Sequence, residues 1–139
     1  MTPVLLDTNV LSEILRPGAD ASVVAFVQSL ERPVVSAITF HELNYGVELM
    51  PQGLRRSRLS AAIGAFQDRF KDCTIVVEGA IAALSGRLRA GEHRAGFKLT
   101  PLDALIAACA LTASATLATH NTKDFKRLGI KLVDPWNSE

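Results

Sequence analysis

The sequence contains little cysteine and no long apolar run. Two cysteines occur among 139 residues, Cys73 and Cys109, and both stand among apolar residues without CxxC or histidine-rich spacing. We therefore predict two small core residues in a reducing cytoplasm rather than zinc ligands or a disulfide. No apolar run reaches the ~18 residues of a membrane helix, and no basic segment precedes the first apolar run, as it would in a signal peptide. These absences predict a cytoplasmic protein that does not bind a membrane.

The charges are unevenly distributed along the chain, although the net charge is only +1. Residues 1–50 contain two basic and six acidic side chains, whereas residues 51–100 contain nine basic and four acidic ones. A metal ion could bind the acidic part while a polyanion lies on the basic part. Two solvated helix faces of opposite charge would give the same counts, so both interpretations stay open.

Short apolar segments alternate with amphipathic ones over residues 1–139, which we predict to form one domain. Strands are expected near residues 4–6, 34–36, 74–77, 116–119 and 130–133. Helices are expected between them, with a basic loop over residues 91–98. The clearest helix start is Thr100 followed by Pro101 and Asp103, an N-cap with an acid three residues later. This alternation predicts an α/β fold with a mainly parallel sheet covered on both faces.

Asp7 stands at the junction between the first strand and the first helix, for which Thr8 or Asn9 is the expected N-cap. In open α/β sheets, ligands bind at the carboxyl ends of the strands. A carboxylate there is suited to binding a hard cation. Alternatively, Asp7 simply caps the helix, because Asp is common at such turns.

Three further acids, Glu42, Asp103 and Asp124, stand near later junctions of the same kind. Each has an ordinary explanation, as a solvated helical residue, a capping-box residue and a first-turn acid. Together they predict a cluster at one edge of the sheet, where two charges ~4 Å apart repel by roughly 1–4 kcal/mol. Mg²⁺ or Mn²⁺ would compensate that charge, activate a water and neutralise a scissile phosphate. The pattern therefore favours metal-assisted phosphodiester hydrolysis.

No serine or cysteine has a histidine partner in an evident motif, so we do not predict a nucleophilic triad. The histidines are scattered, and surface or packing roles are the simpler interpretation for them. His41 and His120 stand next to candidate site residues, and RNA contacts are an alternative for these two.

Five segments resemble the PIN-domain ribonucleases in order and spacing, and most of all the VapC-type toxins of bacterial toxin–antitoxin pairs. The segments are residues 5–9 (LLDTN), 36–43 (SAITFHEL, followed by Gly46), 102–108 (LDALIAA), 118–125 (ATHNTKDF) and 133–136 (VDPW). The resemblance implies a three-layer α/β/α sandwich and an endoribonuclease that depends on Mg²⁺ or Mn²⁺.

The resemblance also implies roles for individual residues. Asp7 and Asp103 match the main metal ligands of the family, Glu42 matches its third acid, and Thr8 matches the residue that steadies the first carboxylate. Family members place the fourth acid at either of two positions, which here are Asn121 and Asp124. Asn121 is an amide that could orient a water, so the charge would come from Asp124, and the number of metal ions stays open.

The implied partners are RNA, a second copy of the chain in a homodimer, and a small VapB-like antitoxin that blocks the acidic cleft. Candidate RNA phosphate contacts are Arg87, Arg89, Arg94 and Lys98, which would position the strand without reading its sequence. Two other functions stay open. One is a phosphatase that forms an aspartyl-phosphate at Asp7, although Asn9 replaces the second acid that such enzymes use. The other is an inactive PIN-like module that binds protein.

Overall fold

The computed structural model describes residues 1–137; the last two residues of the predicted domain lie outside this range. Five short strands form one sheet in the order β3-β2-β1-β4-β5, and every neighbouring pair is parallel. The strands are β1 Val4–Leu6, β2 Pro33–Ser36, β3 Thr74–Ile75, β4 Thr116–Ala118 and β5 Leu132–Val133. The predicted parallel sheet is thus confirmed, with the first strand at its centre.

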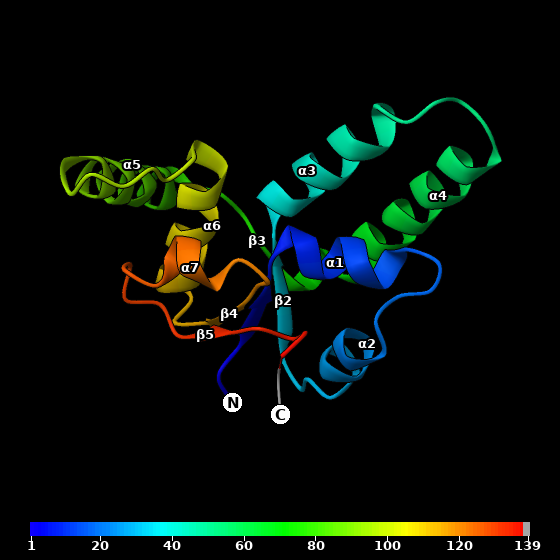
Figure 1. Cartoon of the computed structure of the whole chain (residues 1–139), viewed down its shortest axis with the longest axis horizontal. Coiled ribbons are helices and arrows are strands. Elements are labelled where there is room, and N and C mark those ends of the chain that lie inside the picture. Colours follow the sequence, from blue (N-terminus) through cyan, green and yellow to red (C-terminus); the bar gives the residue numbers. More distant parts are fainter. Residues whose placement is uncertain (138–139) are drawn as a thin grey trace.

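Helices cover both faces of this sheet (Figure 1). One face carries α1 Thr8–Leu15, α2 Ala21–Gln28, α3 Ala37–Glu48 and α4 Leu54–Arg69. The other carries α5 Gly79–Arg94, α6 Pro101–Thr112 and the short α7 Thr122–Phe125. The result is the three-layer α/β/α sandwich that the resemblance implies.

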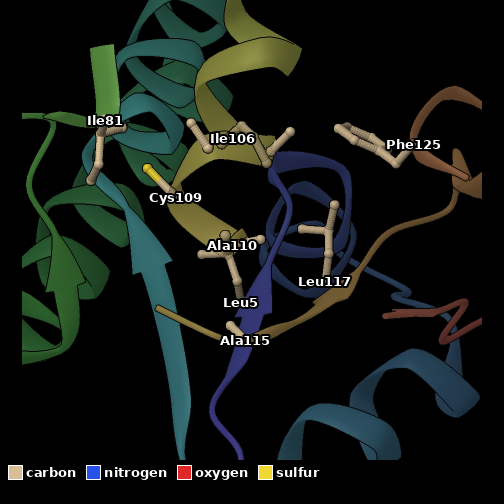
Figure 2. Packing of buried hydrophobic residues seen from close by; sticks show 10 residues of the cluster. Leu5, Ile81, Ile106, Cys109, Ala110, Ala115, Leu117 and Phe125 are labelled. Atoms are coloured by element: carbon tan, nitrogen blue, oxygen red, sulfur yellow. The ribbon is translucent and has the colours of Figure 1, made fainter. Parts of the chain in front are cut away.

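The alternation of side chains along each strand divides the core into two clusters. In β1, Leu5 belongs to the cluster under α5 and α6, whereas Leu6 belongs to the cluster under α1 to α4. The neighbouring β4 repeats this division with Leu117 and Ala118. Figure 2 shows the first cluster. Because both faces of the sheet are buried, consecutive strand residues are apolar. In β1 this apolar run is followed directly by a polar residue, Asp7.

Helix starts at two junctions explain how the chain places its acids. Asp7, rather than the expected Thr8 or Asn9, is the N-cap of α1, and its side chain accepts a hydrogen bond from the Thr8 N–H. The cap of α6 is the predicted Thr100, whose hydroxyl accepts from the Asp103 N–H at 3.2 Å. Both acids therefore begin helices at the same edge of the sheet.

The predicted basic loop over residues 91–98 is partly wrong, because α5 continues to Arg94. This last turn is helical although its sequence is polar, since Glu92 points inward and is 7% exposed. The predicted core position of Cys73 is also wrong: it is exposed in a 3-10 turn, Lys71–Cys73, whereas Cys109 is buried as expected.

The expected strands were too long at three places. The structure ends β3 at Ile75, ends β4 at Ala118 and begins β5 only at Leu132. Val76, which we placed in β3, is 70% exposed and lies beyond the sheet. Among the helices of residues 1–137, none is both long enough and apolar enough to cross a membrane.

Candidate active site

Asp7 lies where β1 and β4 end side by side, and it is only 5% exposed. Its N–H donates to the Ala118 carbonyl at 3.0 Å, which continues the ladder of the sheet. The Thr8 N–H donates to Oδ1 at 2.8 Å, and the Thr119 hydroxyl donates to Oδ2 at 2.8 Å. Each carboxylate oxygen therefore has one fixed donor, and a carboxylate with about four acceptor positions keeps capacity for another partner.

Thr119 is the site residue that sequence reasoning missed. It is fully buried, and besides donating to Asp7 its hydroxyl accepts from the Asn121 N–H at 3.1 Å and from the Asn9 side-chain amide at 3.3 Å. The register that pairs Leu6 with Ala118 places Thr119 beside Asp7. The sequence does show a threonine at the end of a predicted strand. Its role as a partner of Asp7 can be inferred only when it is known that β1 and β4 are neighbours in the sheet.

Glu42 reaches the same place from the first half of α3. The Thr8 hydroxyl donates to Glu42 Oε1 at 2.6 Å, and the Thr39 hydroxyl lies 3.3 Å from that of Thr8. Thr8 therefore contacts both acids, Asp7 through its backbone and Glu42 through its side chain. Glu42 is half-buried, in agreement with the expectation that it faces a cleft rather than open solvent.

The acids share a cleft of about 490 Å³. Its walls include Asp7, Thr8, Glu42, Asp103 and Asn121, together with Asn9, Ser12, Glu13, Arg16, His120 and Trp136. Asp124, in the first turn of α7, is exposed and does not line the cleft. It still acts on the site, because its charge raises the pKa of both Asp7 and Asp103.

Burial is the main reason why the pKa of Asp7 is raised above its ordinary value. The charges of Glu42 and Asp124 raise this pKa further, while the hydrogen bonds from Thr119 and Thr8 act in the opposite direction. Burial also raises the pKa of Asp103, followed by the charges of Asp7 and Asp124. The charged forms of Asp7 and Asp103 are thus both destabilised by neighbouring carboxylates, as expected for acids in one cluster.

The donor set suits a hard cation that keeps part of its water. Among residues 1–137, no three carboxylate, imidazole or thiol groups are arranged to hold an ion by themselves. Mg²⁺ does not need such a cage, since it commonly binds one or two carboxylates and retains several waters. Asp7 and Asp103 provide two carboxylates on one cleft, and Asn121 provides an amide oxygen beside them.

Basic side chains gather at a second hollow, of about 770 Å³, where α5 ends and the chain approaches α6. Three of the four candidate phosphate contacts, Arg89, Arg94 and Lys98, line it. The fourth, Arg87, is exposed but does not line this hollow. Leu99, which also lines the hollow, stands four residues before Asp103, so the segment that leads into α6 connects the two regions along the chain.

An all-parallel α/β/α sandwich with acids at the carboxyl ends of its strands is the arrangement that the sequence resemblance implies. The chain belongs to the PIN domain family, whose sequence profile matches residues 4–131. It is 34% identical to Toxin FitB of Neisseria gonorrhoeae, over 96% of this chain and 99% of that protein. It is 32% identical to VapC ribonuclease Y4jK of Sinorhizobium fredii, over 96% and 97%.

A solved structure confirms this assignment. The structure of FitAB bound to an IR36 DNA fragment superposes with a TM-score of 0.90 at 33% identity, covering 98% of this chain and 97% of that one. The similarity extends over nearly the full length of both chains, so the segments that line the acidic cleft of this chain lie within the common fold.

Proposed function

We propose that this protein is a Mg²⁺- or Mn²⁺-dependent endoribonuclease that acts as the toxin of a toxin–antitoxin pair. The observation that carries the proposal is the acidic cleft: Asp7, Glu42 and Asp103 line it, and Asp124 adds its charge. Relatives named as a toxin and as a VapC ribonuclease support the same activity.

In this proposal Asp7 and Asp103 hold the metal ion, and Glu42 and Asp124 contribute directly or through water. A bound divalent ion lowers the pKa of a water and neutralises charge on the scissile phosphate. The chain supplies the geometry: Thr119 and the Thr8 N–H fix Asp7, and the Thr8 hydroxyl fixes Glu42. Asn121 lines the same cleft, where its side-chain amide would orient water.

We propose that the RNA backbone binds in the basic hollow. Arg89, Arg94 and Lys98 surround one depression next to the start of α6, so a strand held there would lead toward Asp103. Contacts of this kind are electrostatic and independent of sequence, and they weaken as salt concentration rises. Arg87 stays a proposed contact outside the hollow.

We further propose a homodimer that a small antitoxin inhibits. Support for the antitoxin comes from solved toxin–antitoxin complexes, such as FitAB at 33% identity. An antitoxin segment that enters the acidic cleft would neutralise the same carboxylates that hold the metal, which explains inhibition by direct competition.

Cleavage of single-stranded RNA by the purified protein tests the activity. We expect cleavage with Mg²⁺ or Mn²⁺, none with a chelator, and a loss of at least about 100-fold for Asp7→Asn or Asp103→Asn, the scale for removing one electrostatic contact from a reacting centre.

Asp20→Asn is the matched control, because Asp20 caps α2 outside the cleft and Asn is an equally good cap. Full cleavage by either cleft variant would refute the assignment. Phosphate release from small monoesters, with a covalent adduct on Asp7, would favour the phosphatase instead.

A further inference from the structure

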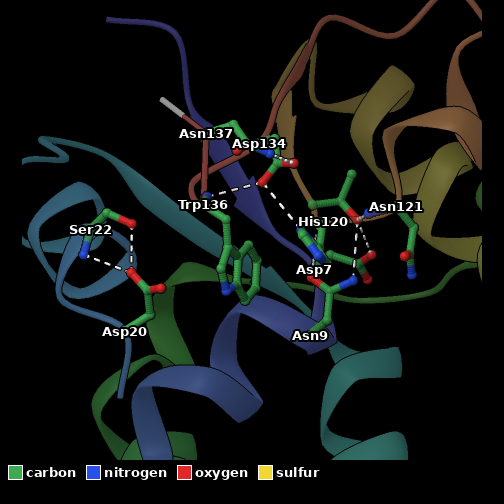
Figure 3. A network of polar contacts seen from close by, with 10 residues as sticks. Asp7, Asn9, Asp20, Ser22, His120, Asn121, Asp134, Trp136 and Asn137 are labelled. Atoms are coloured by element: carbon green, nitrogen blue, oxygen red, sulfur yellow. Dashed lines mark hydrogen bonds and ion pairs between the residues drawn. The ribbon is translucent and has the colours of Figure 1, made fainter. Parts of the chain in front are cut away.

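The acidic cleft does not end at its carboxylates. It continues past the exposed side of α1, where Asn9, Ser12 and Arg16 line it, and reaches two aromatic side chains, His120 and Trp136. Their rings lie 4.4 Å apart between centroids and are tilted by 43°. Figure 3 shows this pair beside Asp7 and Asn9.

Asp134 holds the two aromatic residues in place. Its Oδ1 accepts from the Trp136 N–H at 3.0 Å and lies 3.4 Å from His120 Nδ1, while its Oδ2 accepts from the Asn137 side chain at 2.9 Å. The Trp136 side chain also packs against the core cluster under α1 to α4. Polar contacts on one side and core packing on the other therefore hold the pair at the cleft.

His120 is connected to the catalytic carboxylate through a short chain of contacts. Its backbone N–H donates to the Asn9 side-chain oxygen at 3.3 Å, and the Asn9 amide donates to the Thr119 hydroxyl, which donates to Asp7. The aromatic pair and Asp7 are thus parts of one hydrogen-bonded wall. A ligand that contacts the reacting centre and extends along this wall reaches the rings next.

We propose that Trp136 and His120 form a stacking platform for one nucleobase of the RNA strand, beside the phosphate that is cut; this rests on the proposed function. Single-stranded RNA presents unstacked bases, which proteins bind on aromatic side chains. The platform holds a base and does not take part in bond cleavage. It extends substrate recognition from the backbone, at the basic hollow, to a base at the acidic cleft.

The chain offers a direct probe, because Trp136 is its only tryptophan. Binding is followed by tryptophan fluorescence in the Asp103→Asn variant with Mg²⁺, so that the RNA stays intact. We expect a short single-stranded RNA of mixed sequence to quench the fluorescence. The same strand without bases should bind more weakly and should not quench. Equal quenching by both strands would overturn the proposal.

Two substitutions separate stacking from packing. Trp136→Leu keeps an apolar side chain in the core, whereas Trp136→Phe also keeps an aromatic ring. In the otherwise unaltered enzyme, we expect Trp136→Leu to raise KM by about 5-fold to 100-fold, with a much smaller change in kcat, and Trp136→Phe to restore most of the loss.

Unchanged KM in Trp136→Leu would overturn the proposal. So would parallel losses of kcat and melting temperature in both variants, because these indicate a purely structural tryptophan. The proposed nuclease activity fails separately: base-dependent quenching without any cleavage by the unaltered protein would support the platform and refute the activity.

Discussion

Two buried carboxylates in this protein have opposite environments. Glu92, at the end of α5, is 7% exposed and accepts two hydrogen bonds from Arg127, at 3.0 and 2.7 Å. The guanidinium of Arg127 also lies 3.5 Å from the centre of the Phe97 ring. Asp7 is 5% exposed and has only a hydroxyl and a backbone N–H as donors; no ion pair reaches it from residues 1–137.

We interpret this difference as that between a structural charge, Glu92, and the functional charge that we propose for Asp7. A buried carboxylate that serves only the fold needs a counter-charge from the chain, and Arg127 provides it for Glu92. Asp7 instead has further acids, Glu42 and Asp124, near enough to raise its pKa. Such an arrangement costs stability in the empty protein and is expected where a cation from solution completes the site.

Removing the counter-charge of Glu92 should have the largest effect on stability. Arg127→Ala leaves Glu92 buried without a partner, and we expect the free energy of unfolding to fall by about 3 kcal/mol. This is the low end for a broken buried pair, because the Arg127 side chain is 29% exposed. Denaturant unfolding measures the change.

Arg56→Ala is the control for that experiment, since Arg56 pairs with Glu48, whose side chain is 68% exposed. Exposed pairs contribute about 0–1 kcal/mol. Adding Glu92→Gln to Arg127→Ala should recover part of the loss by removing the unpaired charge. Equal losses for Arg127→Ala and Arg56→Ala would show that burial of Glu92 is not what makes its pair important.

The donor that fixes Asp7 should matter for function more than for folding. Thr119→Val keeps the shape of the side chain but removes the hydroxyl that donates to Asp7 Oδ2 and accepts from the Asn121 N–H and the Asn9 amide. Partners that orient metal ligands typically contribute 10- to 100-fold to activity or metal affinity. We therefore expect about that loss in RNA cleavage, together with a higher Mg²⁺ requirement.

Thr116→Val, at the start of β4 and outside the cleft, is the matched control. If Thr119→Val cleaves RNA normally with the same Mg²⁺ dependence, the hydrogen bond to Asp7 has no role in the site.

Sequence reasoning found the acids because their signal is local. A short apolar run that ends at Asp7, and a cap at Thr100 followed by Asp103, are each visible within a few residues. The parallel sheet then follows from the alternation of strands and helices, and its carboxyl edge explains the position of Asp7 after β1. The predicted strand-to-helix junction at Asp103 is wrong, because α6 follows the helix α5 and not a strand.

The parts that were missed depend on distant contacts. Glu92 looks like a residue of a polar loop until Arg127, 35 residues later, is seen to neutralise it. Thr119 is meaningful only beside Asp7, 112 residues earlier. Cys73 stands among apolar residues in the sequence, yet the turn between α4 and β3 leaves it exposed. Hydrophobic patterning cannot supply such pairings, because it describes one segment at a time.

The smallest expected effect is on the pH dependence of stability, and it tests the comparison most directly. The folded protein raises the pKa of Asp7 above its ordinary value of 3.8, so the neutral form is favoured on folding. The stability that this group contributes is complete below 3.8 and is lost as pH rises through the higher folded pKa. In metal-free buffer at neutral pH, Asp7→Asn should therefore melt at a higher temperature than the unaltered protein, with a flatter pH profile above 3.8.

For Asp20 the pH dependence of stability has the opposite sign, because hydrogen bonds from Ser22 lower the pKa of this carboxyl in the folded protein. The contribution of Asp20 to stability is present above pH 3.8 and is lost as pH falls through the folded pKa, so Asp20→Asn should flatten the pH profile of stability only on the acid side.

Mg²⁺ should raise the melting temperature of the unaltered protein more than that of Asp7→Asn, since a ligand stabilises only the state that binds it. If Asp7→Asn instead melts well below the unaltered protein without metal, the Asp7 carboxylate is a structural charge like Glu92, and the distinction between the two environments fails.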